Sequence, residues 1–368
     1  MAKAEETVLE IDLNALTHNF EYLKSKLKKN TKFLAVVKAF AYGSDAEQVA
    51  LHLQQLNVDY FAVAYTSEGV ALRNAGITKP ILVLHPQPIN FKAIIDHCLE
   101  PSLYSARVLK SFISCAEKEN QSSYPVHIKF NTGLNRLGFW ENDVDYIVSQ
   151  LKNNSSIKIV SVFSHLAASE DLSEKEFTKS QISSFKNTSK KLIDSLNYKP
   201  ILHLCNTSGV LNYPKAHLDM VRCGIGLCGF GNSASENKNL KPIATLKSVI
   251  SQIHLIEKGE SVGYNRAFKS TAFKKTATIP IGHADGVGRH FGNGKGFVFI
   301  NKEKANIIGN VCMDMIMVDI THIDCNEGDE VIIFDNQHTA ENLAESANTI
   351  SYELITSISR RIKRKIIK

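Results

Sequence analysis

The chain has 368 residues, of which 43% are hydrophobic and 22% charged, and its formal net charge is +6. This composition is close to that of folded globular proteins and excludes disordered and fibrous classes, while the length predicts two domains. Part of the positive excess lies in residues 360–365, Arg-Arg-Ile-Lys-Arg-Lys. Because no aromatic interleaving or nucleic-acid motif accompanies this run, we interpret it as a terminal strand with solvated faces and expect no nucleic-acid partner.

The cysteine pattern and the N-terminal segment indicate in which cellular compartment we expect the protein. The seven cysteines form no C-x-x-C pair and show no zinc-site spacing, so we expect no metal and a reducing, cytoplasmic location. The N-terminal segment lacks the pattern of a signal peptide. No apolar run reaches the ~18 residues of a membrane span, so we expect neither secretion nor a membrane partner.

Short apolar runs alternate with helical patterns between about residues 33 and 230, which is typical of repeated βα units. Helices are predicted at Ala46–Leu56 and Ser173–Leu196, among others. Eight strands with intervening helices predict an α/β fold, a (β/α)8 TIM-type barrel. The predicted strands are Phe33–Lys38, Tyr60–Ala64, Ile81–Leu84, Pro101–Tyr104, Val126–Phe130, Ile157–Phe163, Ile201–Leu204 and Gly226–Phe230.

After about residue 240 the chain becomes rich in Val, Ile and Thr, which predicts a mainly β domain interrupted by one helix at Thr339–Ala347. We predict a barrel over residues 12–235 and a C-terminal mainly-β domain over residues 240–368, which also takes an N-terminal strand from residues 1–11. The polar stretch Asn232–Lys241 is the predicted linker. The predicted β runs are Lys247–Leu255, Ala277–Ile281, Gly296–Ile300, Ala305–Val311 and Met317–Ile320.

Lys38 ends the apolar run Phe-Leu-Ala-Val-Val-Lys, where a barrel strand would meet its catalytic loops. Desolvation at such a position would lower the pKa of the lysine and favour the neutral amine that forms a Schiff base. From this segment alone, a lysine whose ammonium group reaches solvent from a strand end is an equal alternative.

The segment VVKAFAYGSD around Lys38 resembles the stretch of bacterial alanine racemases that carries the cofactor lysine. Further segments resemble the same family in the same order over nearly the whole chain. They are EIDLNALTHN, HIKFNTGLNRLGF, FSHLAASED, HLCNTSGV, MVRCGIGLCGFG, SVGYNRAF, IPIGHADGVGR, GNVCMDMIMVDIT and SYELITSISRR. The resemblance implies a pyridoxal 5'-phosphate enzyme that interconverts L- and D-alanine, supplies D-alanine for peptidoglycan, and works as a homodimer with shared active sites.

The resemblance implies two proton-transfer residues. Lys38 would hold the cofactor and move the α-proton on one face of the substrate, and Tyr264 would serve the other face. A two-base racemase needs both groups, because a planar carbanion must be protonated from the side opposite to deprotonation. Without the resemblance, Tyr264 is more simply an aromatic side chain in a turn.

The remaining site residues are also carried over from the family. Arg222 would face the pyridine nitrogen, which stays unprotonated because a guanidinium does not readily release a proton. His165 would pack against the ring, and carbamylation of Lys129 would supply an anion that positions Arg136. Structural roles are the alternatives for these residues, such as an ion pair for Arg222. The implied phosphate-binding residues are Tyr42, Thr207, Gly224, Ile225 and Tyr352, and the implied carboxylate site is Arg136, Met313 and Asp314.

Three positions depart from the family pattern: Phe40 replaces a common Asn, Asn131 a common Asp, and His283 a Tyr at the substrate entrance. They put substrate range in question but remove no proton-transfer group. A broad-specificity amino-acid racemase therefore stays open. A pyridoxal-phosphate barrel decarboxylase and a non-catalytic pyridoxal-phosphate-binding protein are the weaker alternatives, since the latter would need neither Tyr264 nor a second domain.

Overall fold

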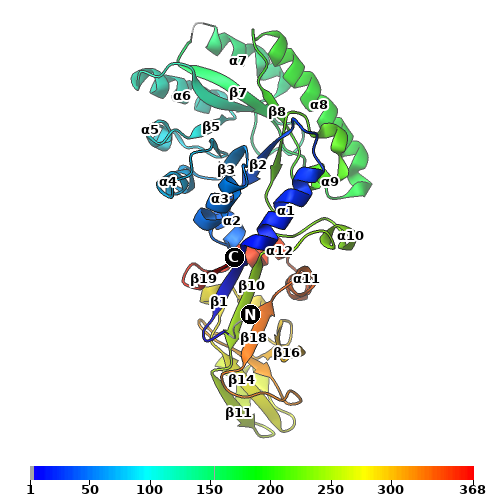
Figure 1. Cartoon of the computed structure of the whole chain (residues 1–368). Helices are drawn as coiled ribbons and strands as arrows, with labels where there is room; N and C mark the ends of the chain where they lie inside the picture. Colours follow the sequence, from blue (N-terminus) through cyan, green and yellow to red (C-terminus); the bar gives the residue numbers. More distant parts are fainter. Residues whose placement is uncertain (1–3, 153) are drawn as a thin grey trace.

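The computed structural model describes residues 4–152 and 154–368. Figure 1 shows a helix-covered barrel above a narrower part built mainly of strands. The predicted fold class, a (β/α)8 barrel followed by a mainly β domain, is confirmed. The division at residues 12–235 and 240–368 stays a prediction. Of the strand predicted over residues 1–11, residues 1–3 lie outside the described part, and the strand is β1 (Val8–Asp12).

Eight parallel strands close the barrel, each paired with the next along the chain until the last returns to the first. Their interior is largely apolar near the closure, where Leu34, Ala62, Leu82 and Met220 form a buried cluster. The strands are β2 (Lys32–Val36), β3 (Tyr60–Val63), β4 (Ile81–Val83), β5 (Glu100–Leu103), β6 (Tyr124–Lys129), β7 (Ile157–Phe163), β8 (Ile201–His203) and β9 (Met220–Cys223).

The prediction for the eighth strand is wrong. The strand is β9 (Met220–Cys223), and the apolar run Gly226–Phe230 forms turns instead. The backbone N–H of Leu227 donates to the carbonyl of Gly224 at 2.9 Å, as expected for a tight turn. Frequent glycines permit these turns. Because the charged residue Arg222 lies inside β9, a prediction based on runs of hydrophobic residues does not detect this strand.

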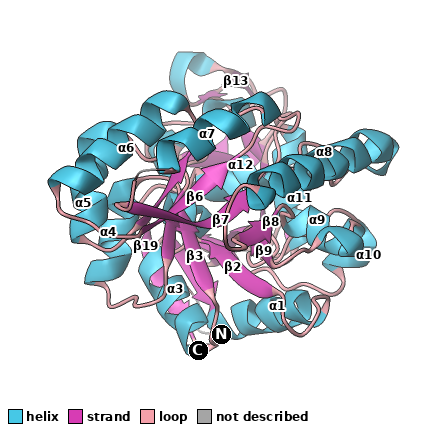
Figure 2. Cartoon of the chain, turned by 90° about the horizontal axis from the view of Figure 1, so that it is seen from above, coloured by secondary structure: helices cyan, strands magenta, loops and turns pink. Residues whose placement is uncertain are grey.

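Helices form the outer layer around the strands (Figure 2). The first shows why such segments are helical: the carboxylate of Asp12 accepts from the N–H groups of Asn14 and Ala15, and an apolar stripe containing Leu16 and Phe20 is buried. The barrel helices are α1 (Leu13–Ser25), α2 (Lys38–Gly43), α3 (Ala46–Gln55), α4 (Thr66–Asn74), α5 (Phe91–Asp96), α6 (Ala106–Lys118), α7 (Val144–Leu151), α8 (Lys175–Asp194) and α9 (Thr207–Asn212).

The lower part contains a nine-stranded sheet in the order β11-β14-β17-β16-β15-β18-β10-β1-β19, and a separate sheet of two short strands. The predicted run Lys247–Leu255 is two strands, because Ile250 and Ser251 interrupt it. The elements are α10 (Ala234–Asn237), β10 (Ala244–Val249), β11 (Gln252–Ile256), β12 (Ser261–Val262), β13 (Phe268–Lys269), β14 (Lys274–Ile279), β15 (Phe297–Ile300), β16 (Glu303–Ile308), β17 (Ile316–Asp319), β18 (Glu330–Phe334), α11 (Gln337–Ser346), α12 (Ser351–Thr356) and β19 (Lys363–Ile367).

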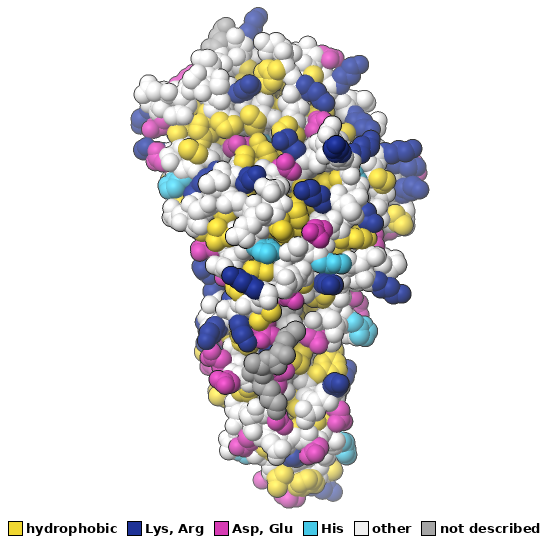
Figure 3. Space-filling model, viewed as in Figure 1, with side chains coloured by type: hydrophobic (Ala, Val, Ile, Leu, Met, Phe, Trp, Pro, Cys, Tyr) yellow, Lys and Arg dark blue, Asp and Glu magenta, His cyan; other side chains and the backbone are white. Residues whose placement is uncertain are grey.

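The basic run at the C-terminus makes internal contacts. β19 pairs in parallel with β1, and Lys365 lies 3.3 Å from Glu10. The Arg364 guanidinium donates to five carbonyl oxygens, among them those of Gly43 and Ser44. On the face in Figure 3, basic and acidic side chains are interspersed. In the described part of the chain, no helix is both long and apolar enough to cross a bilayer.

Candidate active site

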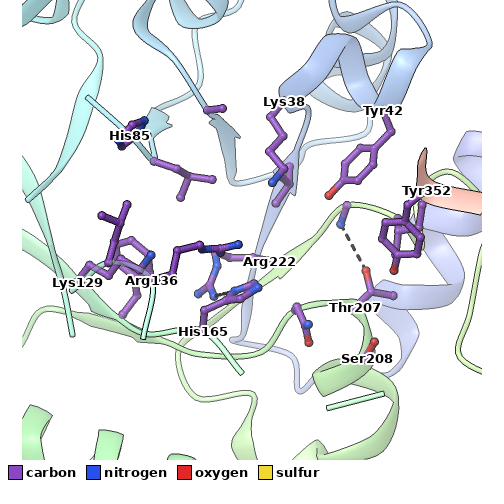
Figure 4. Close-up of a pocket in the computed structure, with 18 residues that line it drawn as sticks. Lys38, Tyr42, His85, Lys129, Arg136, His165, Thr207, Ser208, Arg222 and Tyr352 are labelled. Atoms are coloured by element: carbon purple, nitrogen blue, oxygen red, sulfur yellow. Dashed lines mark hydrogen bonds between the residues drawn. The ribbon is translucent and has the colours of Figure 1, made fainter. Parts of the chain in front are cut away.

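A cavity of about 580 Å³ opens at the carboxyl ends of the barrel strands, where strand ends, loops and the first turns of helices supply the walls (Figure 4). Its lining includes ten of the residues singled out from the sequence, among them Lys38. The lining residues are Val36, Lys38, Tyr42, Ala64, Leu84, His85, Lys129, Arg136, Leu137, Phe163, His165, Asn206, Thr207, Ser208, Arg222, Gly224, Ile225 and Tyr352. No carboxylate is among them, although four lysine and arginine side chains are.

Lys38 stands directly after β2 at the start of α2, whose backbone is unusual. Four consecutive non-glycine residues, 39–42, have φ between 50° and 58°, so they form a left-handed turn. Left-handed helical backbone costs about 1–2 kcal/mol per L-residue. Glu68 holds the turn, because its carboxylate accepts from the N–H of Ala39 at 2.6 Å and from that of Ala64 at 2.8 Å. The turn thereby places Lys38 and Tyr42 on the same cavity.

Burial, and after it the cavity's positive charge, lowers the pKa values of the two lysines in the cavity. Burial, followed by Arg136, lowers the pKa of Lys38. Burial, Arg136, Arg222 and Lys38 together lower the pKa of Lys129 to about 8. Both lysines therefore have an increased fraction of neutral amine, the form that is nucleophilic. A site with four cations and no lining carboxylate is suited to an anionic ligand.

Arg222, on β9, lies at the floor of the cavity and only donates. Its Nη2 lies 2.7 Å from the carbonyl oxygen of Ser164 and 3.1 Å from Nδ1 of His165, and its Nη1 lies 2.9 Å from Nδ1 of His203. Burial lowers the pKa of Arg222 to about 10 and, aided by Arg222, holds the pKa of His165 well below its usual value. His165 is therefore a neutral ring beside a fixed guanidinium.

One side of the cavity gathers hydroxyl groups and tight backbone (Figure 4). Thr207 Oγ1 accepts from the backbone N–H of Gly224 at 3.4 Å. A Cβ added at Gly224 would lie 2.1 Å from the Tyr42 hydroxyl oxygen, so only glycine allows this approach. The ring of Tyr352 meets that of Tyr42 edge to face at 6.5 Å. Hydroxyl and backbone donors around a glycine are suited to a phosphate group.

The opposite side carries Lys129 and Arg136 (Figure 4). Lys129 is buried at the end of β6, with its Nζ 5.9 Å from the centre of the Phe163 ring. Asn131 orders the loop that follows, because its Oδ1 accepts from the N–H groups of Gly133 and Asn135. This loop presents Arg136 to the cavity. The two ends of the cavity therefore differ in chemistry, one rich in hydroxyl groups and the other cationic.

Three predicted site residues lie away from this cavity, in the β part. Tyr264 is 71% exposed and Met313 59% exposed. Asp314 receives a hydrogen bond at 2.6 Å from Arg361, which also pairs with Asp285. The backbone N–H of Ala284 donates to the carbonyl of Met313, so the loops around residues 283 and 313 form one surface. A single chain does not bring these residues to Lys38.

The three departures from the family pattern lie in different surroundings. Phe40 is not among the residues that line the cavity, and the Arg360 guanidinium lies 4.2 Å from its ring centre. His283 is exposed in the β part. Sequence reasoning missed two residues that matter here: Glu68, which holds the turn, and His203, which contacts Arg222. No signal could have found them, since both contacts depend on which strands and helices become neighbours.

Known proteins resemble the chain over its whole length. Family models described as the N-terminal and C-terminal domains of alanine racemase match residues 11–231 and 243–366. An alanine racemase of Clostridium perfringens is 36% identical over 365 residues, covering 96% of this chain and 94% of that protein. The structure of an alanine racemase of Clostridium difficile superposes with a TM-score of 0.92 at 34% identity, covering 100% of this chain and 97% of the other. That of Bartonella henselae, described with covalently bound pyridoxal phosphate, gives a TM-score of 0.89 at 28% identity, covering 99% and 100%.

Proposed function

The chain belongs to the alanine racemase family and is an isomerase that interconverts L- and D-alanine, and we propose that it does so with pyridoxal 5'-phosphate bound through Lys38. The observation that carries this proposal is the position of Lys38, at the end of β2 in a cavity that has four cationic side chains and no lining carboxylate. The solved relative from Bartonella henselae, described with the covalently bound cofactor, supports it.

The phosphate end would be held by Tyr42, Thr207, Gly224, Ile225 and Tyr352. The support is the close approach at Gly224, where an added Cβ would meet the Tyr42 hydroxyl. Phosphate needs several donors at short range, and hydroxyl and backbone N–H groups supply them without adding charge. This arrangement fits the group that the family implies.

The ring end would lie against Arg222 and His165. When bound, the cofactor withdraws electrons from the substrate α-carbon and so makes its hydrogen acidic. Arg222 donates to carbonyl oxygens and imidazole nitrogens and keeps its own protons. A guanidinium in this place does not protonate the ring nitrogen, which limits the electron withdrawal and suppresses side reactions.

Lys38 would move a proton at the α-carbon on one face, since its lowered pKa leaves neutral amine available. The other face would be served by Tyr264 of a second copy, with Met313 and Asp314 of that copy near the substrate carboxylate. We therefore propose a homodimer with shared sites. Its support is that Tyr264 and Met313 are strongly exposed on the β part, whereas Lys38 lines the cavity in the barrel.

Arg136 would bind the substrate carboxylate through its paired N–H donors. Lys129 would be carbamylated: its neutral amine adds carbon dioxide and releases one proton, giving an anion that neutralises part of the surrounding charge. The lowered pKa of Lys129, about 8, supports this step. We also propose a cytoplasmic location, which the seven free cysteine thiols support, and a role of D-alanine in peptidoglycan supply.

The test measures D-amino acid formation and carbon dioxide release from L-alanine and several other L-amino acids, together with visible absorbance of the bound cofactor. Wild-type protein should form D-alanine without releasing carbon dioxide. Lys38→Ala should lose the absorbance and the activity. Lys32→Ala is the matched control, because Lys32 is exposed at the opposite end of the same strand. Activity and absorbance retained by Lys38→Ala would overturn the assignment, and release of carbon dioxide would identify a decarboxylase.

A further inference from the structure

One half of the barrel interior contains buried polar side chains, most of which do not line the cavity. Near the closure between β2 and β9, the interior is the apolar cluster of Leu34, Ala62, Leu82 and Met220. Across from it, five consecutive strands place buried polar side chains inside the barrel. They are Glu100 on β5, His127 on β6, Ser161 on β7, His203 on β8 and Arg222 on β9. Buried polar groups are costly unless each is paired, so this arrangement needs an explanation.

These side chains form one continuous series of hydrogen bonds. Arg222 Nη1 lies 2.9 Å from Nδ1 of His203, whose Nε2 lies 2.8 Å from Ser161 Oγ. Ser161 Oγ lies 2.5 Å from Nδ1 of His127, whose Nε2 lies 2.7 Å from Oε2 of Glu100. The series runs from the cavity floor at Arg222 to the first residue of β5. It therefore links the cavity to the opposite end of the barrel.

The direction of every bond follows from its two ends. A guanidinium only donates, so His203 accepts at Nδ1 and must carry its proton at Nε2. That proton goes to Ser161, whose hydroxyl then donates to His127 Nδ1. His127 carries its proton at Nε2 and donates it to the Glu100 carboxylate, which only accepts. With a neutral His127 and an ionised Glu100, this arrangement satisfies all five groups.

In the described part of the chain, Arg222 has no carboxylate among its hydrogen-bond partners. It donates to the carbonyl oxygens of Ser164 and Leu204 and to the imidazoles of His165 and His203, all of them neutral acceptors. Glu100 at the far end is the buried carboxylate of the series, and the Tyr60 hydroxyl also hydrogen-bonds to it. The phenyl ring of Phe163 stacks on His203 at 4.9 Å, which restricts that imidazole from turning. The guanidinium is thus fixed by groups that depend on one another.

We propose that Glu100, His127 and Ser161 are positioning residues for the reaction: through His203 they fix the orientation of the Arg222 guanidinium toward the ring of the cofactor. The carboxylate sets the direction of the series, and the series presents an acceptor, His203 Nδ1, to Arg222. The effect on the reaction rests on the proposed function, since it requires that the cofactor ring lies against Arg222. The direction of the hydrogen bonds does not depend on it.

The direction can be measured by neutron crystallography of the deuterated protein, purified in the presence of pyridoxal 5'-phosphate. We expect deuterium at Nε2 and none at Nδ1 in both His127 and His203. Deuterium on Nδ1 of either ring would overturn the series. Since this measurement needs no turnover, its result stands even if the proposed function fails.

The effect on the reaction is tested with Ser161→Ala, which interrupts the series at its middle while removing one oxygen. Ser102→Ala is the matched control: Ser102 is equally buried on β5, in register with His127, and its hydroxyl has no hydrogen-bond partner in the described part of the chain. We expect kcat of Ser161→Ala to fall about tenfold, with KM for alanine changed less than about twofold, because Arg136 is untouched. The visible absorbance of the bound cofactor should shift in this variant and stay unchanged in Ser102→Ala.

Ser161→Thr keeps the hydroxyl group and should restore most of kcat, which separates the hydrogen bond from the loss of volume. Glu100→Gln keeps an acceptor oxygen but removes the charge and should show an intermediate loss of kcat. If Ser161→Ala and Ser102→Ala have the same kcat and the same cofactor absorbance, while the wild-type protein racemises alanine and shows a visible cofactor band, the positioning role is refuted and the proposed function stands. If the wild-type protein shows neither racemisation nor a cofactor band, the proposed function fails first. Should Ser161→Ala not fold, the kcat and absorbance of Glu100→Gln decide between these outcomes, and values equal to those of the wild type refute the role.

Discussion

Replacing Gly224 by alanine should obstruct the proposed phosphate site through a single methyl group. The added Cβ would lie 2.1 Å from the hydroxyl oxygen of Tyr42 and 2.7 Å from Cζ of the same ring. Both distances are too short for carbon, so the tyrosine has to move. Tyr42 cannot simply rotate away, because it ends the left-handed turn and packs against the Tyr352 ring. Overpacking of this kind costs about 1–3 kcal/mol.

We expect that cost to appear mainly in cofactor affinity, since the displaced hydroxyl is a proposed phosphate ligand. A loss of about 1–3 kcal/mol corresponds to a dissociation constant raised roughly 5- to 150-fold. The assay titrates the cofactor-free protein with pyridoxal phosphate and follows visible absorbance. Circular dichroism should show an unchanged fold, which distinguishes a local obstruction from general unfolding.

A double-mutant cycle gives the control. Tyr42→Ala removes the atoms that the new methyl group would meet, and it weakens cofactor binding by itself. Gly224→Ala introduced into that variant should then weaken cofactor binding little further. The loss of binding free energy in the double variant should therefore be well below the sum of the losses in the two single variants. Full additivity, or wild-type affinity in Gly224→Ala alone, would refute the reasoning about this close approach.

The other predictions concern assembly, titration and the C-terminal strand. Mixing Lys38→Ala with Tyr264→Phe under conditions of subunit exchange should restore roughly a quarter of wild-type activity if sites are shared, and no recovery despite demonstrated exchange would place both groups in one chain. The pKa of Lys129 is about 8 in the folded protein and 10.5 ordinarily. Above pH 8 the folded state has therefore lost a proton that the unfolded state keeps, and the free energy of unfolding should rise between pH 8 and 10.5 by up to about 1.4 kcal/mol per pH unit. Denaturant titrations of cofactor-free protein in carbon dioxide-free buffer should show a smaller rise for Lys129→Met, and equal slopes would contradict the shift. Arg364→Ala should lower the free energy of unfolding by about 2–4 kcal/mol, because several carbonyl oxygens lose their donor, whereas Lys363→Ala on the exposed side of the same strand should change it by less than about 0.5 kcal/mol. Similar values for the two variants in chemical denaturation would show that the Arg364 contacts contribute little.

The sequence predicts the barrel well because its strands are short apolar runs with helical segments between them. It fails at β9, where Arg222 points into the barrel and a charged residue interrupts the apolar pattern. It also fails at residues 39–42, since Ala-Phe-Ala-Tyr contains no glycine and gives no sign of left-handed backbone. Both failures lie at the cavity, where local sequence preference and the final structure conflict.

The polar series in the barrel could not have been predicted from one sequence for a different reason. His127, Ser161 and His203 lie on three different strands, and their contact depends on the relative register of those strands. A shift by one residue would turn each side chain to the other face of its strand. The exposed Tyr264 and Met313 are a related case, because a single chain places them away from the cavity.

The left-handed turn explains why the C-terminal segment belongs to the same functional unit as the barrel. Four L-residues in this conformation cost about 1–2 kcal/mol each relative to ordinary backbone, so the turn does not persist on its own preference. At the start of the turn, the carboxylate of Glu68, a residue of the barrel, accepts a hydrogen bond from the backbone. Its end is held from residues more than three hundred positions away, because Arg364 donates to the carbonyl of Gly43 at 2.8 Å. A Cβ at Gly43 would lie 2.0 Å from the carbonyl oxygen of Ile355, so α12 packs directly on the same turn. The position of Lys38 therefore depends on both parts of the chain, and a barrel cut away from residues 351–367 would lose the contacts that oppose this strain.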